Sequence, residues 1–483
     1  MAERLSARQA IALVGDDFHE LAHPARESEP DGPLGWEGYD ASRARAAERT
    51  GEQESVVCGT ARVEGTRAVL IAFEFGFLGG SLGRRTGDRL EAAYAHAREH
   101  RLPVVPLVAT GGSRMQEGML ALTQLQRVAR QSALTRAAGL PQIAVVRDPT
   151  TGGGWATLGA GADVILALPG AQVGFAGSRV RPADADPAAY RAEAQMAAGS
   201  VDAVVRPEEL RATLGLWLRL LSRPSTAAVA PPRALSTAEP ATGSGSPTGS
   251  AAGLRTTGLP ATGLPATGLP ATGLPATGWD AVRRARSPER PRAERYLDSC
   301  FTRRVALRGD RCGGTDDGML CGFGELDGGT VAYAAQTGTA TRPAGYRTAT
   351  RLIRLADRLG IPVLTLVDTP GAANDAEAER QGAGAAIAEL FGAVAAARTP
   401  ITTLVIGEGG SGGALALAAP GNTWATPDSY FSVIAPELAA AILKRPPDQA
   451  PATAEQLRIR PQDLVELGVV RGVVPVLGDP DAA

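Results

Sequence analysis

Short apolar runs alternate with longer amphipathic stretches through most of this chain. Four apolar runs in the first half predict buried strands, at 68–72, 104–108, 143–146 and 164–166. Three runs in the second half predict strands at 331–335, 363–367 and 401–406. The stretches between these runs predict helices at 87–100, 116–139, 346–359 and 377–398. Repeated strand–helix units predict two α/β domains of similar size.

The alternation breaks between the two halves, where large apolar side chains become rare. Residues 223–278 are rich in Pro, Ala, Thr, Gly and Ser, and Gly-Leu-Pro-Ala-Thr occurs four times between residues 258 and 277. Such a segment buries too little surface to offset the entropy of ordering it. We predict a flexible linker at 223–278 between domains at 1–222 and 279–483, which holds the halves together without fixing their geometry. A sortase signal is disfavoured because no apolar tail or basic stop follows the repeats.

The composition narrows the class of protein. The chain has 483 residues and a net charge of −2, so its charge does not favour nucleic acid or an anionic membrane as a partner. Its four cysteines form no Cys-X-X-Cys pair, which favours reduced thiols over a zinc ribbon or a disulfide framework. No signal peptide or apolar run of membrane length is visible, so we expect a cytoplasmic protein.

Glycine-rich segments stand where four of the predicted strands end, at 110–117, 148–154, 368–371 and 407–414. Glycine lets the backbone approach a ligand closely, and a strand-to-helix turn aims N–H groups at an oxygen. One such turn is most simply a tight connection. Matched turns in both halves instead indicate two oxyanion holes. The last segment lacks the ending of a phosphate loop, and neither half has the spacing of a Rossmann fingerprint.

Side chains that serve as catalytic bases are scarce near these turns. All four histidines lie elsewhere, which disfavours a Ser-His-Asp triad. His96 and His100 are interpreted as part of a solvated helix face rather than a metal site. We interpret Asp368 as the organiser of a turn. The site is therefore predicted to act through backbone dipoles, with the base arriving on a cofactor.

Longer motifs resemble a known family. The first half resembles the β subunit of bacterial acetyl-CoA carboxylase carboxyltransferase, with matching segments at 72–83, 111–117, 148–153 and 174–179. The second half resembles the α subunit of the same enzyme, with matching segments at 345–347, 368–372, 379–380, 406–414 and 432–437. The resemblance covers nearly all of the chain outside the predicted linker.

This resemblance implies an α/β fold with two crotonase-like domains, each a ββα superhelix. In that family, carboxybiotin on a separate carrier protein donates its carboxyl group to acetyl-CoA, which gives malonyl-CoA. Biotin freed of CO2 takes a proton from the thioester, while two oxyanion holes hold the enolate and the biotin ureido oxygen. The chain has no Met-Lys biotinylation motif and nothing that resembles an ATP-grasp carboxylase. The implied partners are therefore a biotin carboxylase and a biotin carboxyl carrier protein, and a homodimer would reproduce the family's assembly.

The resemblance also implies site residues. Those of one hole are Gly111, Gly112, Gly152 and Gly153. Those of the other are Gly371, Gly409, Gly410, Gly412 and Gly413. Contacts with the cofactor or with coenzyme A are implied for Arg114, Arg179, Ser411, Ala414 and Lys444.

Three departures from the family leave the identity of the substrate and the docking of the carrier open, more than the type of reaction. The four-cysteine zinc ribbon that usually begins the β subunit is absent, so no zinc is expected. A basic loop of the α subunit has no counterpart near residues 338–344, and Ala373-Asn374-Asp375 replaces an aromatic-Pro-Gly segment. Two alternatives to acetyl-CoA carboxylation therefore remain. One is a decarboxylase of biotin-linked or malonyl thioesters, and the other is a non-catalytic scaffold of a carboxylase complex.

Overall fold

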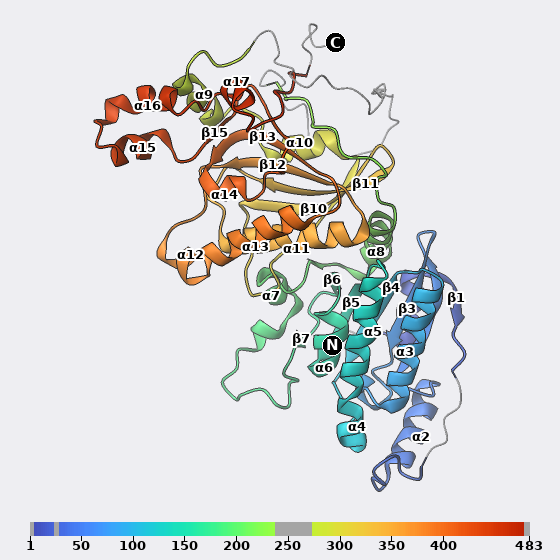
Figure 1. Cartoon of the computed structure of the whole chain (residues 1–483). Coiled ribbons are helices and arrows are strands. Elements are labelled where there is room, and N and C mark those ends of the chain that lie inside the picture. Colours follow the sequence, from blue (N-terminus) through green and yellow to red (C-terminus); the bar gives the residue numbers. More distant parts are fainter. Residues whose placement is uncertain (1–3, 24–28, 237–272, 478–483) are drawn as a thin grey trace.

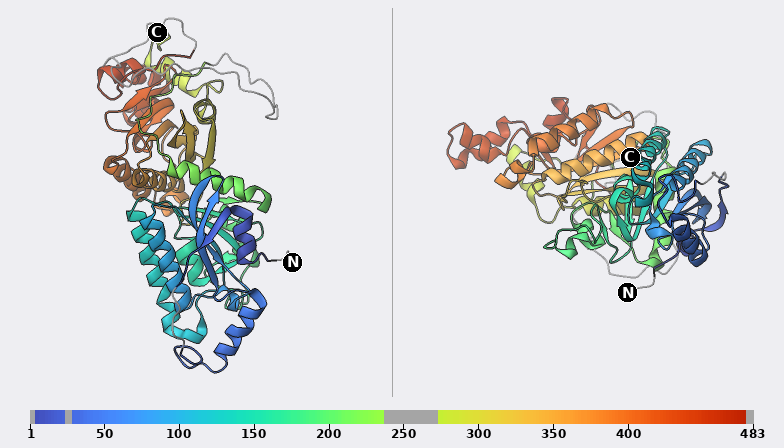
Figure 2. Two further views of the ribbon diagram at one scale, coloured as in Figure 1. Left: turned by 90° about the vertical axis from the view of Figure 1, so that its right-hand side faces the viewer. Right: turned by 90° about the horizontal axis from the view of Figure 1, so that it is seen from below.

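The computed structural model of the chain describes residues 4–23, 29–236 and 273–477. These residues form two halves, each a β-sheet covered by helices, and the second half lies above the first in Figure 1 and in the left view of Figure 2. The prediction of two α/β domains is confirmed. None of the helices within these ranges combines the length and apolar character needed to cross a membrane.

The first half is built on an eight-stranded sheet in the order β1-β2-β3-β4-β5-β6-β8, with β7 paired to β5. The strands β1 to β3 are antiparallel neighbours, and those from β3 onward run parallel. The strands are β1 (Asp16–Glu20), β2 (Val56–Val63), β3 (Thr66–Phe73), β4 (Val104–Thr110), β5 (Ile143–Thr151), β6 (Val164–Ala167), β7 (Val173–Gly174) and β8 (Ala203–Val204). The α-helices are α1 (Ala7–Val14), α2 (Tyr39–Thr50), α3 (Arg84–Glu99), α4 (Gly118–Leu122), α5 (Gln124–Ala137), α6 (Gly152–Gly154), α7 (Ala192–Ala197) and α8 (Pro207–Ser222). Short 3-10 or π-helical turns lie at Leu78–Gly80, Met115–Glu117, Trp155–Gly159 and Pro187–Tyr190.

The second half repeats this plan in a seven-stranded sheet with the order β14-β13-β12-β11-β10-β9, and β15 pairs with β13. An antiparallel hairpin again leads into parallel strands. The strands are β9 (Arg303–Ala306), β10 (Met319–Leu326), β11 (Gly329–Gln336), β12 (Val363–Thr369), β13 (Ile401–Gly410), β14 (Thr423–Ala425) and β15 (Tyr430–Ser432). The helices are α9 (Gly278–Arg286), α10 (Ala293–Cys300), α11 (Pro343–Leu359), α12 (Ala376–Arg380), α13 (Ala383–Ala396), α14 (Ser411–Leu415), α15 (Pro436–Ile442), α16 (Ala450–Gln456) and α17 (Pro461–Glu466), with a 3-10 turn at Pro447–Gln449.

Central strands are continuous apolar runs because helices cover both faces of each sheet. Along β3, Leu70 and Ala72 face a core shared with α1 and α8, whereas Val69 and Ile71 face the core under α3. The apolar runs that predicted seven strands all lie within observed strands, which confirms them.

Two of the predicted helices are interrupted. The helix predicted at 377–398 is wrong as a single element, because Gly382 adopts a left-handed φ of 78° and separates α12 from α13. The helix predicted at 116–139 begins as a 3-10 turn and continues as α4 and α5, which meet at Thr123.

Both flanks of the predicted linker pack against the second half. Pro224 pairs with Thr330, and Ala234 pairs with Val476. Val229 and Ala234 are buried in the core under β11 and β13. Residues 223–236 and 273–277 therefore belong to the second half, and the remainder of the predicted linker, with most of its repeats, lies outside the described residues.

Helix α8 fastens the two halves together. It packs on β2, β3 and β5 of the first half and on β10 and β11 of the second. The Trp217 ring meets Phe323 edge-on, with ring centroids 6.1 Å apart. One continuous apolar cluster contains both side chains, so α8 fixes how the halves lie relative to one another, and the prediction about the linker itself stays a prediction.

A buried carboxylate adds polar interactions between the halves. Asp202, fully buried before β8, accepts hydrogen bonds from Arg311 at 2.5 Å and from Arg351 at 3.1 Å, both in the second half. Burial raises the pKa of Asp202, but the charges of the two arginines outweigh burial and hold that pKa below its usual value. Arg358 reaches Asp163 at 2.7 Å nearby.

Candidate functional site

In each half, two turns at the ends of adjacent parallel strands touch one another. In the first half, the turn after β4 meets the start of α6, and a Cβ on Gly152 would lie 3.2 Å from the Cα of Gly112. In the second half, the turn after β12 meets the start of α14, and a Cβ on Gly413 would lie 2.5 Å from the nitrogen of Ala372. The glycines allow this contact because any side chain would force the turns apart.

The two pairs of turns agree in their hydrogen bonds. The last threonine of the first strand accepts from the N–H two residues later: Gly112 donates to Thr110 at 3.0 Å, and Gly371 donates to Thr369 at 3.1 Å. A short parallel bridge then supports each turn, between Leu82 and Ser113 in one half and between Thr341 and Ala372 in the other. The duplication predicted from the glycine segments therefore extends to individual backbone groups.

The second turn of each pair also agrees in its backbone conformation. Gly152 begins α6 with a φ of 63°, and Ser411 begins α14 with a φ of 59°. Ser411 is one of the few residues other than glycine in the left-handed region among those described, and it is exposed. A non-glycine residue held there indicates that the turn is constrained by its surroundings.

Several predicted N–H donors already have partners within the chain. Gly111 donates to the carbonyl of Gly79 at 2.9 Å, and Gly152 donates to that of Phe175 at 3.0 Å. With Gly112 and Gly371, whose bonds to threonine are given above, four of the predicted site glycines shape the turns. The N–H groups that lack an acceptor among the described residues include those of Ser113, Gly153, Ala372 and Gly412.

Two of these four, Ser113 and Ala372, are absent from the predicted site. Both lie one residue beyond a glycine whose N–H bonds to the threonine. The spacing Thr-X-Gly was a usable signal, since it occurs at Thr110 and again at Thr369. Gly409 and Gly410 lie at the end of β13, where they pair with β15.

Arg114 supports the first pair of turns from inside the protein. Its guanidinium donates to Glu54 at 2.5 Å and to the hydroxyl of Tyr39 at 3.2 Å, and it lies 3.6 Å from Glu117. The residue is 1% exposed, so it does not reach a ligand, which corrects the prediction that it binds a cofactor. Because α2 carries Tyr39, this network ties the helix to the turn after β4.

Acidification is expected to destabilise the first half through Glu54. Burial raises the pKa of Glu54, but the charge and hydrogen bonds of Arg114 outweigh burial and lower the pKa to about 2, from an ordinary 4.5. Since the folded-state value is the lower one, the stabilisation is complete above pH 4.5 and is lost as the pH falls towards 2. Urea unfolding between pH 5 and pH 2 should give a flatter pH dependence for Glu54→Gln than for the unmodified protein. Glu208→Gln, at an exposed site, serves as the control, and an equal slope for all three proteins would contradict the assignment.

The other predicted ligand contacts differ in exposure. Arg179 and Lys444 are exposed, and Lys444 follows α15 with a left-handed φ of 57°. Ala414 is fully buried, so its side chain does not reach a ligand. Arg179 and Lys444 remain accessible to a charged ligand, and no interaction within the described residues tests that role.

Asp368 is held in place as the organiser of a turn, as predicted. Its carboxylate is fully buried and accepts from Arg290 at 2.6 Å and from Arg292 at 3.1 Å. The backbone N–H of Glu408 also donates to it at 3.2 Å. A carboxylate with three donors is poorly suited to remove a proton from a substrate.

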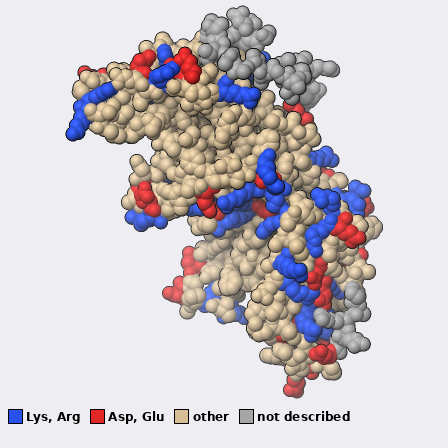
Figure 3. Space-filling view, viewed as in Figure 1, with Lys and Arg blue, Asp and Glu red and all other residues tan. Residues whose placement is uncertain are grey.

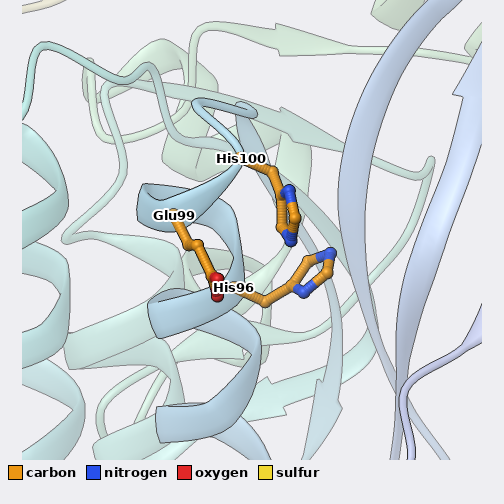
Figure 4. A group of neighbouring side chains, drawn as sticks. All are labelled: His96, Glu99 and His100. Carbon is orange, nitrogen blue, oxygen red and sulfur yellow. The ribbon is translucent and has the colours of Figure 1, made fainter.

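The histidine pair stands apart from the glycine turns. His96 and Glu99 lie in the last turn of α3 and His100 caps it, with the two imidazole rings 4.1 Å apart (Figure 4). The atoms of these three side chains that could bind a metal lie within 4.8 Å of one another. In the described ranges, no other group of three His, Cys, Asp or Glu residues is close enough to form a possible metal site. Glu99 and His100 are exposed, and the group shares no residue with either pair of turns.

Exposed apolar side chains border both pairs of turns. Met115 and Phe175, beside the first pair, are 77% and 74% exposed. Val433, which directly follows β15, is 73% exposed, and Ile442, at the end of α15, is 69% exposed. In Figure 3, charged residues gather where the halves meet and along the helices of the first half, while much of the second half is uncharged on that face. Exposed apolar groups in this number mark a surface that another molecule covers.

The sequence of this chain is similar to those of known proteins. Residues 36–202 match the carboxyl transferase domain, and residues 275–478 match the model described as acetyl co-enzyme A carboxylase carboxyltransferase-like. The acetyl-coenzyme A carboxylase carboxyl transferase subunits beta/alpha of Salinispora arenicola are 39% identical over 98% of this chain and 82% of their own length. The chain belongs to the biotin-dependent acyl-CoA carboxyltransferase family. It is a carboxyl-transferring enzyme, as predicted.

Other members of this family are also similar to the chain. A probable biotin-dependent acyl-coenzyme A carboxylase beta3 subunit of Mycobacterium bovis is 32% identical over 98% of this chain and 88% of its own length. The transcarboxylase 12S structure, a hexamer with hydrolysed methylmalonyl-coenzyme A bound, superposes with a TM-score of 0.74 at 19% identity, covering 98% of this chain and 87% of that one. A single-chain long-chain acyl-CoA carboxylase superposes with a TM-score of 0.69 at 20% identity, covering 97% of this chain and 44% of that one. These structures establish the fold, and the prediction of two crotonase-like domains is confirmed.

Proposed function

We propose that this protein transfers the carboxyl group from carboxybiotin, carried on a separate protein, to acetyl-CoA. The observation that carries the proposal is the duplicated pair of strand-end turns, each with two N–H groups that lack an acceptor. Ser113 and Gly153 form one oxyanion hole, and Ala372 and Gly412 form the other. The remaining predicted glycines keep the turns in contact. One hole binds the thioester oxygen and the other the ureido oxygen of biotin.

The chain's own groups fit a reaction whose base comes from outside. Carboxybiotin, when bound, supplies the CO2 and the basic nitrogen. Two N–H donors at each hole stabilise negative charge as it develops on a carbonyl oxygen, and the loss of one such donor costs about 2.7–4 kcal/mol in transition-state stabilisation. Asp368, at the end of β12, is buried and paired with two arginines, so the proposal gives it no role as a base.

A second copy of the chain completes the active site in this proposal. The turns at α6 and α14 lie well apart within one chain (Figure 1), so one copy does not bring its two holes together. The exposed apolar side chains beside each hole are suited to burial between two copies. We infer a homodimer that receives its carboxylated carrier from a separate biotin carboxylase. Exposed Arg179 and Lys444 are candidates for contact with the phosphates of coenzyme A or with the carrier.

The proposal is tested with a panel of acyl-CoA thioesters. Purified protein is supplied with carboxylated carrier protein and with acetyl-, propionyl- or a longer acyl-CoA, and product is measured by mass spectrometry. We expect malonyl-CoA to form fastest. Faster carboxylation of another thioester would change the assigned substrate. Loss of CO2 from malonyl-CoA without net transfer to acetyl-CoA would favour a decarboxylase, and no turnover at all would favour a scaffold.

A further inference from the structure

The second oxyanion hole has a buried side-chain clamp that the first lacks. Gln336, the last residue of β11, is fully buried. Its amide nitrogen donates to the hydroxyl of Thr341 at 3.2 Å and to the carbonyl of Gly413 at 3.3 Å. Gly413 belongs to one turn of the hole, whereas Thr341 lies in the loop before α11 and pairs with Ala372 of the other turn. One amide group therefore ties the turns to one another.

Thr341 connects Gln336 to the backbone of the turn after β12. Its N–H donates to the carbonyl of Gly371 at 3.2 Å, and its carbonyl accepts from Ala373 at 2.9 Å. The residue between these two positions is Ala372, whose N–H lacks an acceptor. A shift of Gln336 would thus move Thr341 and, with it, the direction of the Ala372 N–H.

Tyr346 supports the same place from α11. Its hydroxyl is buried without a hydrogen-bond partner in the described residues, and it lies 2.5 Å from the position that a Cβ on Gly413 would take. The Oε1 atom of Gln336 is likewise buried without a partner. A buried polar atom without a partner costs stability, so the unpaired Oε1 atom of Gln336 calls for an explanation.

The first half is built differently at the matching position. The sheet registers place Ala335 opposite Leu366 and Ala72 opposite Leu107, so Phe73 occupies the position that Gln336 occupies in the second half. Phe73 has no group that could join the two turns. The side-chain support of the first hole comes instead from Arg114 and from the hydroxyl of Thr151, which donates to the carbonyl of Thr110 at 3.3 Å. The two holes are thus held by different chemistry.

We propose that Gln336 and Tyr346 are positioning residues that fix the separation and direction of the Ala372 and Gly412 N–H groups. The inference rests on the proposed carboxyltransferase function. A small displacement of groups that orient a reaction costs about 100-fold in rate. Because both residues are fully buried, they act through the backbone and do not contact the substrate.

The test compares Gln336→Leu with Tyr346→Phe, each in the full-length protein. Gln336→Leu retains volume but removes the donor, and we expect kcat for carboxyl transfer to fall about 10- to 100-fold while KM for acyl-CoA changes less than about twofold. Tyr346→Phe should lower kcat by less. The matched control is Gln131→Leu, which removes a buried amide that bonds Glu91 and Arg98 far from both holes. It should lower thermal stability without changing kcat of the folded enzyme.

Amide hydrogen exchange supplies a second readout that does not depend on activity. Peptides that contain residues 370–373 and 411–416 should exchange faster in Gln336→Leu than in the unmodified protein, and at unchanged rates in Gln131→Leu. Unchanged exchange in both peptides, or a kcat equal to that of the unmodified protein, would overturn the positioning role. If the unmodified protein transfers no carboxyl group, the proposed function fails, and the exchange rates still decide whether Gln336 fixes the turns.

Discussion

Replacement of Gly413 by alanine is expected to slow carboxyl transfer by about 100- to 1,000-fold. The new Cβ would lie 2.5 Å from the nitrogen of Ala372 and 2.5 Å from the hydroxyl of Tyr346, where no carbon fits. The nearest of these atoms belongs to the backbone, so the turn after β12 must move. That movement displaces the Ala372 N–H from the oxyanion, while the strands that hold the turn remain paired.

The effect is measured as kcat for carboxyl transfer at saturating acyl-CoA and carboxylated carrier. Gly392→Ala is the matched control, because a Cβ at Gly392 in α13 meets nothing within 4 Å. Circular dichroism and thermal unfolding establish that both variants are folded. Transfer by Gly413→Ala within a factor of about three of the control would show that the Ala372 N–H does not bind the oxyanion.

Local sequence was sufficient to place the strands and the turns that follow them. The runs at 104–108 and 363–367 are buried on both faces, so an apolar run alone identifies them. The glycines at 111–112 and 371 stand directly after these strands, where a tight turn requires them. The two-domain fold and the position of the candidate site follow from these local patterns.

The identity of the free N–H groups could not be predicted in the same way. Whether an N–H is free depends on acceptors far along the chain, as for Gly152, whose partner is the carbonyl of Phe175. The glycines were conspicuous, yet two of the four unpaired donors belong to Ser113 and Ala372. Arg114 shows the same limit, since its partner Glu54 lies 60 residues earlier. Its position beside a turn suggested a ligand, and its long-range pairing buries it.

The contact between the halves also could not be predicted from local sequence. The helix α8 is amphipathic, which predicts a buried face but not the two sheets that share it. Asp202 follows no recognisable motif, and its partners Arg311 and Arg351 lie more than 100 residues away. The contact between the halves therefore combines the shared apolar core around α8 with the buried carboxylate of Asp202.

Replacement of Asp202 by alanine is expected to lower the free energy of unfolding by about 3–5 kcal/mol. The change leaves the partly buried guanidinium groups of Arg311 and Arg351 without their carboxylate, and it removes the acceptor of two backbone N–H groups, those of Ile165 and Arg308. Guanidinium denaturation monitored by tryptophan fluorescence gives the free energy, since Trp217 lies at the contact between the halves.

Asp298→Ala provides the matched comparison for this prediction. Asp298 also pairs with an arginine, Arg304 at 2.8 Å, but its side chain is 66% exposed, so its loss should cost no more than about 1 kcal/mol. The pKa of Asp202 is lowered in the folded protein, so its contribution is present above the ordinary pKa of aspartate and is lost as the pH falls through the folded-state value. The difference between the two variants should therefore narrow in acid. Equal destabilisation by both variants at neutral pH would mean that α8 alone joins the halves and that the buried charges add nothing to their union.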